Sequence, residues 1–234
     1  MRLKEILRQK LSEGDYGTLV AMVPEHGGKV ANGLIGFLAD TDEQRKWTAV
    51  RALGLVTAGL YSLDPERARR VIRQLIWNLN DESGGIGWGM AEAFGEILAV
   101  VPDLRKEYTG LLAAYISEKG CFIENEEIQK GVIWGLGRIG SLEGEVKARI
   151  LPFLLQVLHV SNPGMQGLAA WAVGEMKIQE ALSHLNNLQI ENRMIKIFDK
   201  TILKEKPLDQ WINEALSKLV EGGEPSERER LEMQ

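Results

Sequence analysis

Few side chains in this sequence have the types and spacing that chemistry at a protein site requires. Glu92 and Glu96 stand four residues apart, so a helix would place both carboxylates on one face, and Glu175 supplies a third carboxylate further along the chain. Such groups could transfer protons or bind a cation. Glutamates on a helix surface more often form ion pairs, with Arg138 as the candidate partner here. We therefore predict no catalytic residue.

The histidines and the cysteine give no pattern of metal ligands. His26, His159 and His184 are the only histidines and stand far apart, and Cys121 is the only cysteine. One cysteine can form neither an intramolecular disulfide nor a Cys-based zinc site. Cys121 also has no identifiable histidine base, so we interpret it as a structural thiol. The sequence predicts no metal site and no cofactor.

The glycine-rich stretch "NDESGGIGWG", residues 80–89, raises the question of a phosphate-binding loop. No Lys-Ser or Lys-Thr follows the glycines and no strand pattern precedes them, which excludes the P-loop and the dinucleotide fingerprint. We expect Ser83 to cap a helix whose first two turns hold the glycines, with close packing offsetting their cost. The alternative is that Ser83, Gly84 and Gly85 contact an anion or ligand at the positive helix end.

The elements that must position these residues follow an internal repeat. Four segments share a small-apolar-glycine signature, and their glycines are spaced by 41, 42 and 37 residues. Twelve residues before each glycine stands a residue favoured at a helix N-cap. The signature glycines are Gly54, Gly95, Gly137 and Gly174, and the corresponding caps are Asp42, Ser83, Asn125 and Asn162. This period predicts stacked pairs of helices.

A second helix is expected before each signature segment. Apolar residues recur at helical spacing over residues 68–79, 104–116 and 146–158, and more weakly over 29–39, where glycines interrupt the pattern. No segment has the sustained alternation that we would assign to a strand, so we predict an all-α fold.

The sequence "WTAVRALG" at residues 47–54 resembles HEAT-like repeats, particularly the short variety named for phycobilisome-lyase proteins. The resemblance covers residues 28–176 and extends more weakly to 203, and the "NDESGGIGWG" stretch is similar to one in uncharacterised bacterial members of this group. It implies a right-handed α-α superhelix of four to five helix pairs with terminal capping helices. The repeat specifies a fold and implies no activity.

The chain is expected to form one HEAT-like domain over residues 1–220. We assign an N-terminal cap to residues 1–27, with a break at "EHGG" before the first repeat, and repeats to residues 28–203. The last part of that range reads as a degenerate fifth helix pair. A final helix is expected at 207–220, and the charged segment 221–234 is expected to be a disordered tail.

Helical register divides each signature helix into two faces. One face is apolar and should pack on the partner helix, and small residues beside the glycines should let adjacent repeats approach closely. The opposite face holds one tryptophan per repeat among charged residues, a composition enriched at binding hot spots. We expect this face to line an exposed concave groove formed by Trp47, Arg51, Trp88, Glu92, Glu96, Lys130, Trp134, Arg138, Trp171 and Glu175.

The groove predicts a non-enzymatic interaction module that binds a protein segment, a peptide or a small polar ligand. Its charges balance and the chain carries a net charge of -5, which argues against nucleic acid as the partner. No apolar run could cross a membrane and no signal-peptide core is present, so we expect a cytoplasmic protein. The alternative is a glycosylase-like DNA-repair enzyme acting on alkylated bases, because such enzymes can use HEAT-like repeats with a groove of tryptophans, an aspartate and basic residues.

Overall fold

The computed structural model describes residues 2–80, 87–191, 193–199 and 201–223. Its elements follow the chain in the order α1 (Leu3–Glu13), α2 (Tyr16–Ala21), α3 (Val23–Ile35), α4 (Glu43–Leu63), α5 (Pro65–Leu79), α6 (Met90–Val100), α7 (Pro102–Ala114), α8 (Glu126–Ile139), α9 (Gly144–Leu158), α10 (Pro163–Glu175), the 3₁₀ turn η1 (Gln179–Ala181), α11 (Leu182–Asn186), β1 (Met194–Asp199), β2 (Ile202–Pro207) and α12 (Leu208–Gly223).

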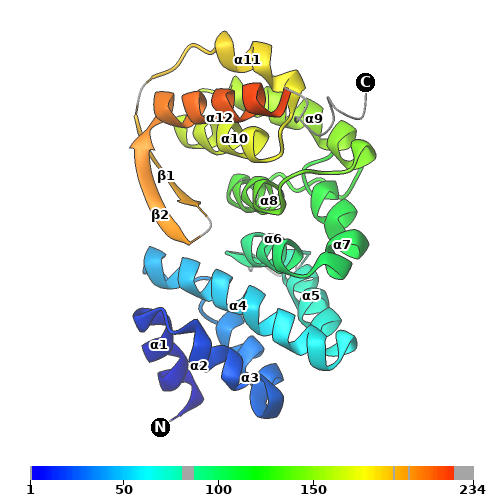
Figure 1. Ribbon diagram of the computed structural model, residues 1–234, viewed down its shortest axis with the longest axis vertical. Helices are drawn as coiled ribbons and strands as arrows, with labels where there is room; N and C mark the ends of the chain where they lie inside the picture. Colours follow the sequence, from blue (N-terminus) through cyan, green and yellow to red (C-terminus); the bar gives the residue numbers. More distant parts are fainter. Residues whose placement is uncertain (1, 81–86, 192, 200, 224–234) are drawn as a thin grey trace, which may run out of the picture.

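The helices form a stack of pairs. The signature helices α4, α6, α8 and α10 lie one above another, and the outer helices α5, α7 and α9 pack along one side of them (Figure 1). At one end α1, α2 and α3 pack on α4, and at the other end α12 packs on α10. Helices α1 and α12 therefore lie at opposite ends of the stack (Figure 1). In the described residues, no helix is long and apolar enough to cross a membrane.

Local signals start most of the signature helices where the repeat predicts. Asp42, Asn125 and Asn162 each accept a hydrogen bond from a backbone N–H in the first turn of α4, α8 and α10. These bonds satisfy N–H groups that the helix itself leaves without partners. The expected cap and ligand contact at Ser83, Gly84 and Gly85 lies outside the described residues.

Helix α6 begins later than predicted. Its first residue is Met90, so Gly87 and Gly89 precede the helix and do not occupy its first turns. Gly89 has a φ of 72°, in the left-handed region that favours glycine. A Cβ added there would lie 2.4 Å from the carbonyl oxygen of Leu38. Gly89 therefore lies tightly against the backbone of the preceding repeat.

The signature glycines allow neighbouring repeats to pack backbone against backbone. A Cβ added at Gly95 on α6 would lie 2.2 Å from the Cα of Gly135 on α8, and one at Gly174 would lie 2.9 Å from the Cα of Ala215 on α12. The predicted close approach is thus confirmed. The "EHGG" segment, by contrast, does not break the chain but lies inside α3, where Gly27 makes room for Leu60.

The apolar face of each signature helix forms the core, as predicted. Its residues are buried apart from Met90, which is half-buried and packs against the core. They are Ala49, Leu53, Val56, Met90, Phe94, Ile97, Val132, Leu136, Ile139, Ala169, Val173 and Met176.

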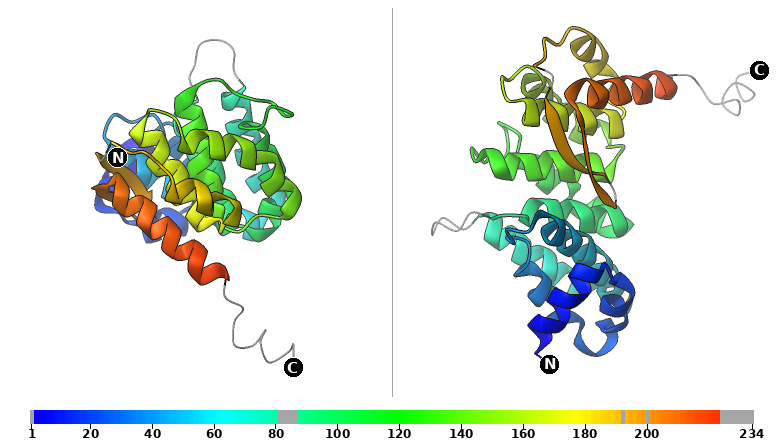
Figure 2. Two further views of the ribbon diagram at one scale, coloured as in Figure 1. Left: turned by 90° about the horizontal axis from the view of Figure 1, so that it is seen from above. Right: turned by 90° about the vertical axis from the view of Figure 1, so that its left-hand side faces the viewer.

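The expected helical fifth repeat is wrong over residues 194–207. After the short helix α11, the chain forms an antiparallel hairpin in which Asp199 pairs with Ile202 at the tip and Met194 pairs with Pro207 at the base. Ile195 and Ile197 are buried, whereas Met194 and Lys196, which precede each of them, are exposed; this two-residue period is what a strand produces. Figure 2 shows the hairpin lying across the inner helices.

The final helix continues further than predicted, because α12 runs from Leu208 to Gly223. Its apolar face covers α10, which would otherwise be exposed at the end of the stack. The rest of the expected disordered tail, residues 224–234, lies outside the described residues.

Candidate binding site on the concave face

Three of the four predicted groove tryptophans form one cluster with the tip of the hairpin. Phe198 on β1 stacks on Trp47 with ring centroids 4.8 Å apart and an interplanar angle of 4°. Trp134 lies 4.8 Å from Trp47 and 6.4 Å from Trp171 between ring centroids. The repeat therefore brings these rings together as predicted, but the chain's own hairpin covers them.

The hairpin backbone is held by tryptophan side chains. The Trp134 Nε1–H donates to the Phe198 carbonyl oxygen at 2.7 Å, and the Trp211 Nε1–H of α12 donates to the Ile195 carbonyl oxygen at 3.0 Å. Trp134 and Trp171 are each 2% exposed, so the prediction that they face solvent is wrong. The sequence pattern of a helix predicts which of its faces lies opposite the core. It does not predict whether a distant segment of the chain covers that face.

Trp88 lies apart from this cluster. Because α6 begins at Met90, Trp88 stands in the turn before the helix, and its side chain is 42% exposed. Trp88 would be in helical register with the other tryptophans only if α6 began at Ser83, as the repeat predicted.

Glu96, at the middle of the row, is a fully buried carboxylate between two arginines. It forms an ion pair with Arg51 of α4, and the Arg138 Nε of α8 lies 2.7 Å from its Oε2 atom. A Cβ at Gly54 would lie 2.7 Å from the Glu96 Cγ, so the signature glycine of the first repeat makes room for this side chain. Burial raises the pKa of the Glu96 carboxyl, and the positive charges of Arg138 and Arg51 oppose that rise.

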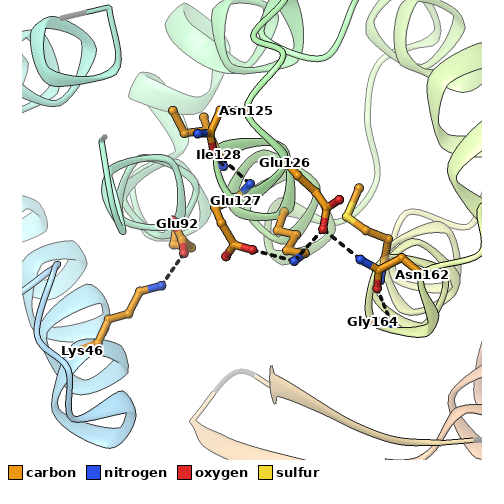
Figure 3. Close-up of polar contacts among 10 residues, drawn as sticks. Lys46, Glu92, Asn125, Glu126, Glu127, Ile128, Asn162 and Gly164 are labelled. Atoms are coloured by element: carbon orange, nitrogen blue, oxygen red, sulfur yellow. Dashed lines mark hydrogen bonds and ion pairs between the residues drawn. The ribbon is translucent and has the colours of Figure 1, made fainter. Parts of the chain in front are cut away.

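The remaining charged residues of the row also form ion pairs, either between neighbouring repeats or, for Lys130, within one helix. Figure 3 shows Lys46 of α4 reaching Glu92 of α6, with 2.8 Å between the Nζ and Oε1 atoms. It also shows Asn162, the cap of α10, donating to Glu126 of α8 at 2.9 Å. Lys130 pairs with Glu126 at 2.9 Å and with Glu127 on its own helix. Most of the predicted row thus forms bonds inside the stack.

Glu175 opens onto a hollow at the last repeat. Its Oε1 atom lies 2.5 Å from the Nζ of Lys218 on α12. The hollow has a volume of about 630 Å³ and lies between the end of α10, the hairpin and α12. We call it the charged hollow, and its lining residues are Gly174, Glu175, Lys177, Asp199, Lys204, Lys206, Glu214, Ser217, Lys218 and Glu221.

The charged hollow is lined by side chains of both charges. Lys204 pairs with Asp199 within the hairpin, and Lys206 pairs with Glu214 of α12. Lys177 is exposed, and among the described residues it has no ion-pair partner. Apart from Glu175, none of these lining residues was predicted from the sequence. The two-residue alternation of "MIKIFDKTILKEKP" was the signal that could have placed a hairpin beside the last repeat.

The groups that could carry out chemistry are paired or stand apart from one another. Within the described part of the chain no three His, Cys, Asp or Glu side chains gather as metal ligands. The predicted row contributes Glu92 and Glu96, both buried and paired with cations. Cys121 is exposed and therefore does not pack in the core. A glycosylase-like groove would need exposed tryptophans and unpaired cations, and the row instead buries Trp134 and Trp171.

Comparison with known proteins identifies the fold but no family. No family model matches the chain, and no curated protein matches it. An engineered protein from the Northeast Structural Genomics Consortium matches with a TM-score of 0.52 and 16% identity, over 94% of this chain and 91% of that chain. A designed armadillo repeat protein matches with a TM-score of 0.48 and 14% identity, over 92% of each chain. The chain is a helical-repeat solenoid.

The hairpin determines which part of this solenoid is open for binding. In a solenoid the inner helices line the concave face, which is the usual binding surface. Here the hairpin occupies the aromatic part of that face, and the charged hollow opens beside it. The aromatic cluster is therefore covered by the hairpin, and the charged hollow beside it is open.

Proposed function

We propose that this protein is a non-enzymatic scaffold that binds an extended segment of another protein on its concave face. The open part of the site is the charged hollow, and the partner segment carries charges of both signs. Catalysis plays no part in this function.

One observation carries the proposal: the concave face already holds an extended backbone. Trp134 donates its indole N–H to the carbonyl oxygen of Phe198, and Trp47 stacks on the Phe198 ring. A hydrogen bond to a main-chain carbonyl and contact with an aromatic face are the means by which grooves hold extended peptides. The hairpin satisfies these groups from within the chain, so a partner uses the neighbouring surface.

The charged hollow provides that surface. It is lined by both lysines and acidic residues, and Lys177 lies on its wall without an ion-pair partner among the described residues. An extended segment with a carboxylate near Lys177 and a cation near the opposite wall would complement it. Charge pairs at the rim of an interface determine which partner binds more than how tightly it binds.

Selection from a random peptide library on the immobilised full-length chain tests the proposal. Enriched peptides would be synthesised and their affinity measured by fluorescence anisotropy. K177E should weaken binding by roughly tenfold through loss of a charge pair. S217W should abolish binding, because its ring would fill the hollow from α12.

Matched variants on other surfaces serve as controls. S62W is matched to S217W, because each serine is exposed and bonds the carbonyl four residues earlier, Ser62 to Ala58 and Ser217 to Asn213. K29E on α3 is matched to K177E. Both controls should bind the peptides as the wild type does. A library that enriches no peptide, or peptides unaffected by S217W, would refute the proposal.

We further propose that the repeats are HEAT-like, of the short type named for phycobilisome-lyase proteins, in one domain over residues 1–220 of a cytoplasmic protein. The signature helices α4, α6 and α8 are each followed by one outer helix, and the signature glycines recur at the helix contacts between repeats. Limited proteolysis should leave one protected fragment that contains every helix from α1 to α12.

A further inference from the structure

Two histidines lie against each other on the side of the last repeat, outside the concave face. The Nε2 atom of His159 is 2.9 Å from the Nδ1 atom of His184, and the two ring centroids are 5.2 Å apart. His159 follows the last residue of α9, and His184 belongs to α11. Their separation in the sequence gave no sign of a pair, because only the turn of the chain through η1 brings them together.

The two ring nitrogens are separated as two ligands of one metal ion would be. Zinc holds imidazole nitrogens at about 2.0–2.1 Å. Two such nitrogens are roughly 3.0 Å apart in octahedral coordination and roughly 3.4 Å apart in tetrahedral coordination. The observed 2.9 Å is close to the octahedral value, and binding an ion requires both rings to rotate so that their nitrogen lone pairs converge on it instead of sharing a hydrogen bond.

We infer that His159 and His184 form a two-histidine site for a divalent transition-metal ion such as Zn²⁺. Neutral imidazole suits zinc, copper and nickel, whereas magnesium and calcium prefer oxygen ligands. His159 is exposed and His184 half-buried, so water can complete the coordination. The proposal is independent of the concave face, since none of the residues that line the charged hollow takes part.

The bound ion would fasten the last repeat. Lys147 of α9 and Glu180 of η1 already form an ion pair at 3.0 Å between the same two parts of the chain. A metal bridge between His159 and His184 adds a second connection there, and α11 is too short to be stable by itself. Metal binding should therefore stabilise the connection that leads into the hairpin.

Calorimetric titration of ZnCl₂ into the full-length chain, first stripped with EDTA, tests this site. The expected result is one zinc ion per chain. H159N and H184N should each weaken binding by more than about tenfold, because each removes one of two ligands. H26N is the matched control, since His26 is exposed on α3 and should leave binding unchanged. Circular dichroism in EDTA checks that each variant is folded.

Electron paramagnetic resonance with Cu²⁺ in place of zinc gives a second measurement. The wild-type spectrum should contain couplings from two imidazole nitrogens, and the spectrum of either variant should contain one. Zinc should also raise the melting temperature of the wild type and leave that of H159N unchanged. Absence of saturable binding, or equal binding by wild type, H159N and H184N, would overturn the inference and leave a hydrogen bond between the two rings.

Discussion

Glu96 places a carboxylate with no exposed surface between two guanidinium groups that each remain partly exposed. Burial penalises its charged form, so the ion pairs add little net stability compared with apolar side chains of the same size. Removing the carboxylate alone has a different effect, because Arg51 and Arg138 would then face each other without an anion between them. The residue is therefore needed where it is, even though the network itself is not strongly stabilising.

E96Q should lower the free energy of unfolding by about 2–4 kcal/mol, since breaking a buried pair leaves uncompensated charge. Urea denaturation would measure the loss. The triple variant R51M/E96L/R138M, which removes every charge of the network, should recover most of that stability. Equal stability of E96Q and the wild type would contradict this account.

Asp40 gives the molecule a predictable response to acid. Arg45 donates to both carboxylate oxygens, at 2.6 Å and 2.9 Å, and these bonds hold the pKa of Asp40 at about 2, below its usual value. A carboxyl whose pKa is lower in the folded state stabilises that state above its unfolded pKa, and the stability is lost as pH falls.

The melting temperature should therefore decrease between about pH 4 and pH 2, and D40N should make that decrease shallower. R45M should have the same effect, since it removes the other partner. Calorimetric scans across this pH range would measure the slopes. Wild-type and D40N slopes that coincide would show that this pair does not contribute.

At the scale of elements, the spacing of α6 and α8 depends on glycines that face each other. The Cβ that G95A introduces would lie 2.2 Å from the Gly135 Cα, where backbone atoms must move to accept it. Gly110 on α7 is a contrasting position, because a Cβ there would have no neighbour within 4 Å.

G95A should destabilise the protein by about 3 kcal/mol, through overpacking between two backbones. G110A should stabilise it by about 0.5–1 kcal/mol, because alanine is the better helix former and nothing obstructs it. Thermal unfolding of the two variants would measure both changes. A G95A variant as stable as wild type would mean that α6 and α8 can separate freely.

Local patterns explain why the helices could be predicted from the sequence and the cover on the groove could not. Caps such as Asp42 and the apolar face of α4 depend on residues within a few turns of one another. The burial of Trp134 depends on Phe198, 64 residues further along the chain. The start of α6 was also wrong, because glycines fit a helix end and a loop equally well. The tryptophans were thus placed on the correct face but in the wrong environment.

At the scale of the whole molecule, the hairpin connects repeats that would otherwise not meet. Repeats of a solenoid normally contact only their neighbours. Here Phe198, which precedes the last helix, stacks on Trp47 of α4, and Lys196 lies 3.8 Å from Glu43 of the same helix. The first and last repeats therefore share contacts across the concave face.

F198A should lower the free energy of unfolding by about 3–5 kcal/mol, since the side chain is 1% exposed and leaves a cavity. Hydrogen exchange should become faster in α4 as well as in the hairpin, because the two are in direct contact. Truncation of Ile202, which is 55% exposed on the other strand, should change neither. Faster exchange confined to residues 194–207 would argue against coupling between the two ends.

The same hairpin determines how the protein responds to a mechanical load. A stack of helix pairs without such a hairpin extends gradually under force, because each pair can separate slightly from the next. In this chain the hairpin links the two ends of the stack through its contacts with Trp47 and Trp211. Under force along the long axis, the molecule should resist extension until these hairpin contacts break, and should extend gradually only after that.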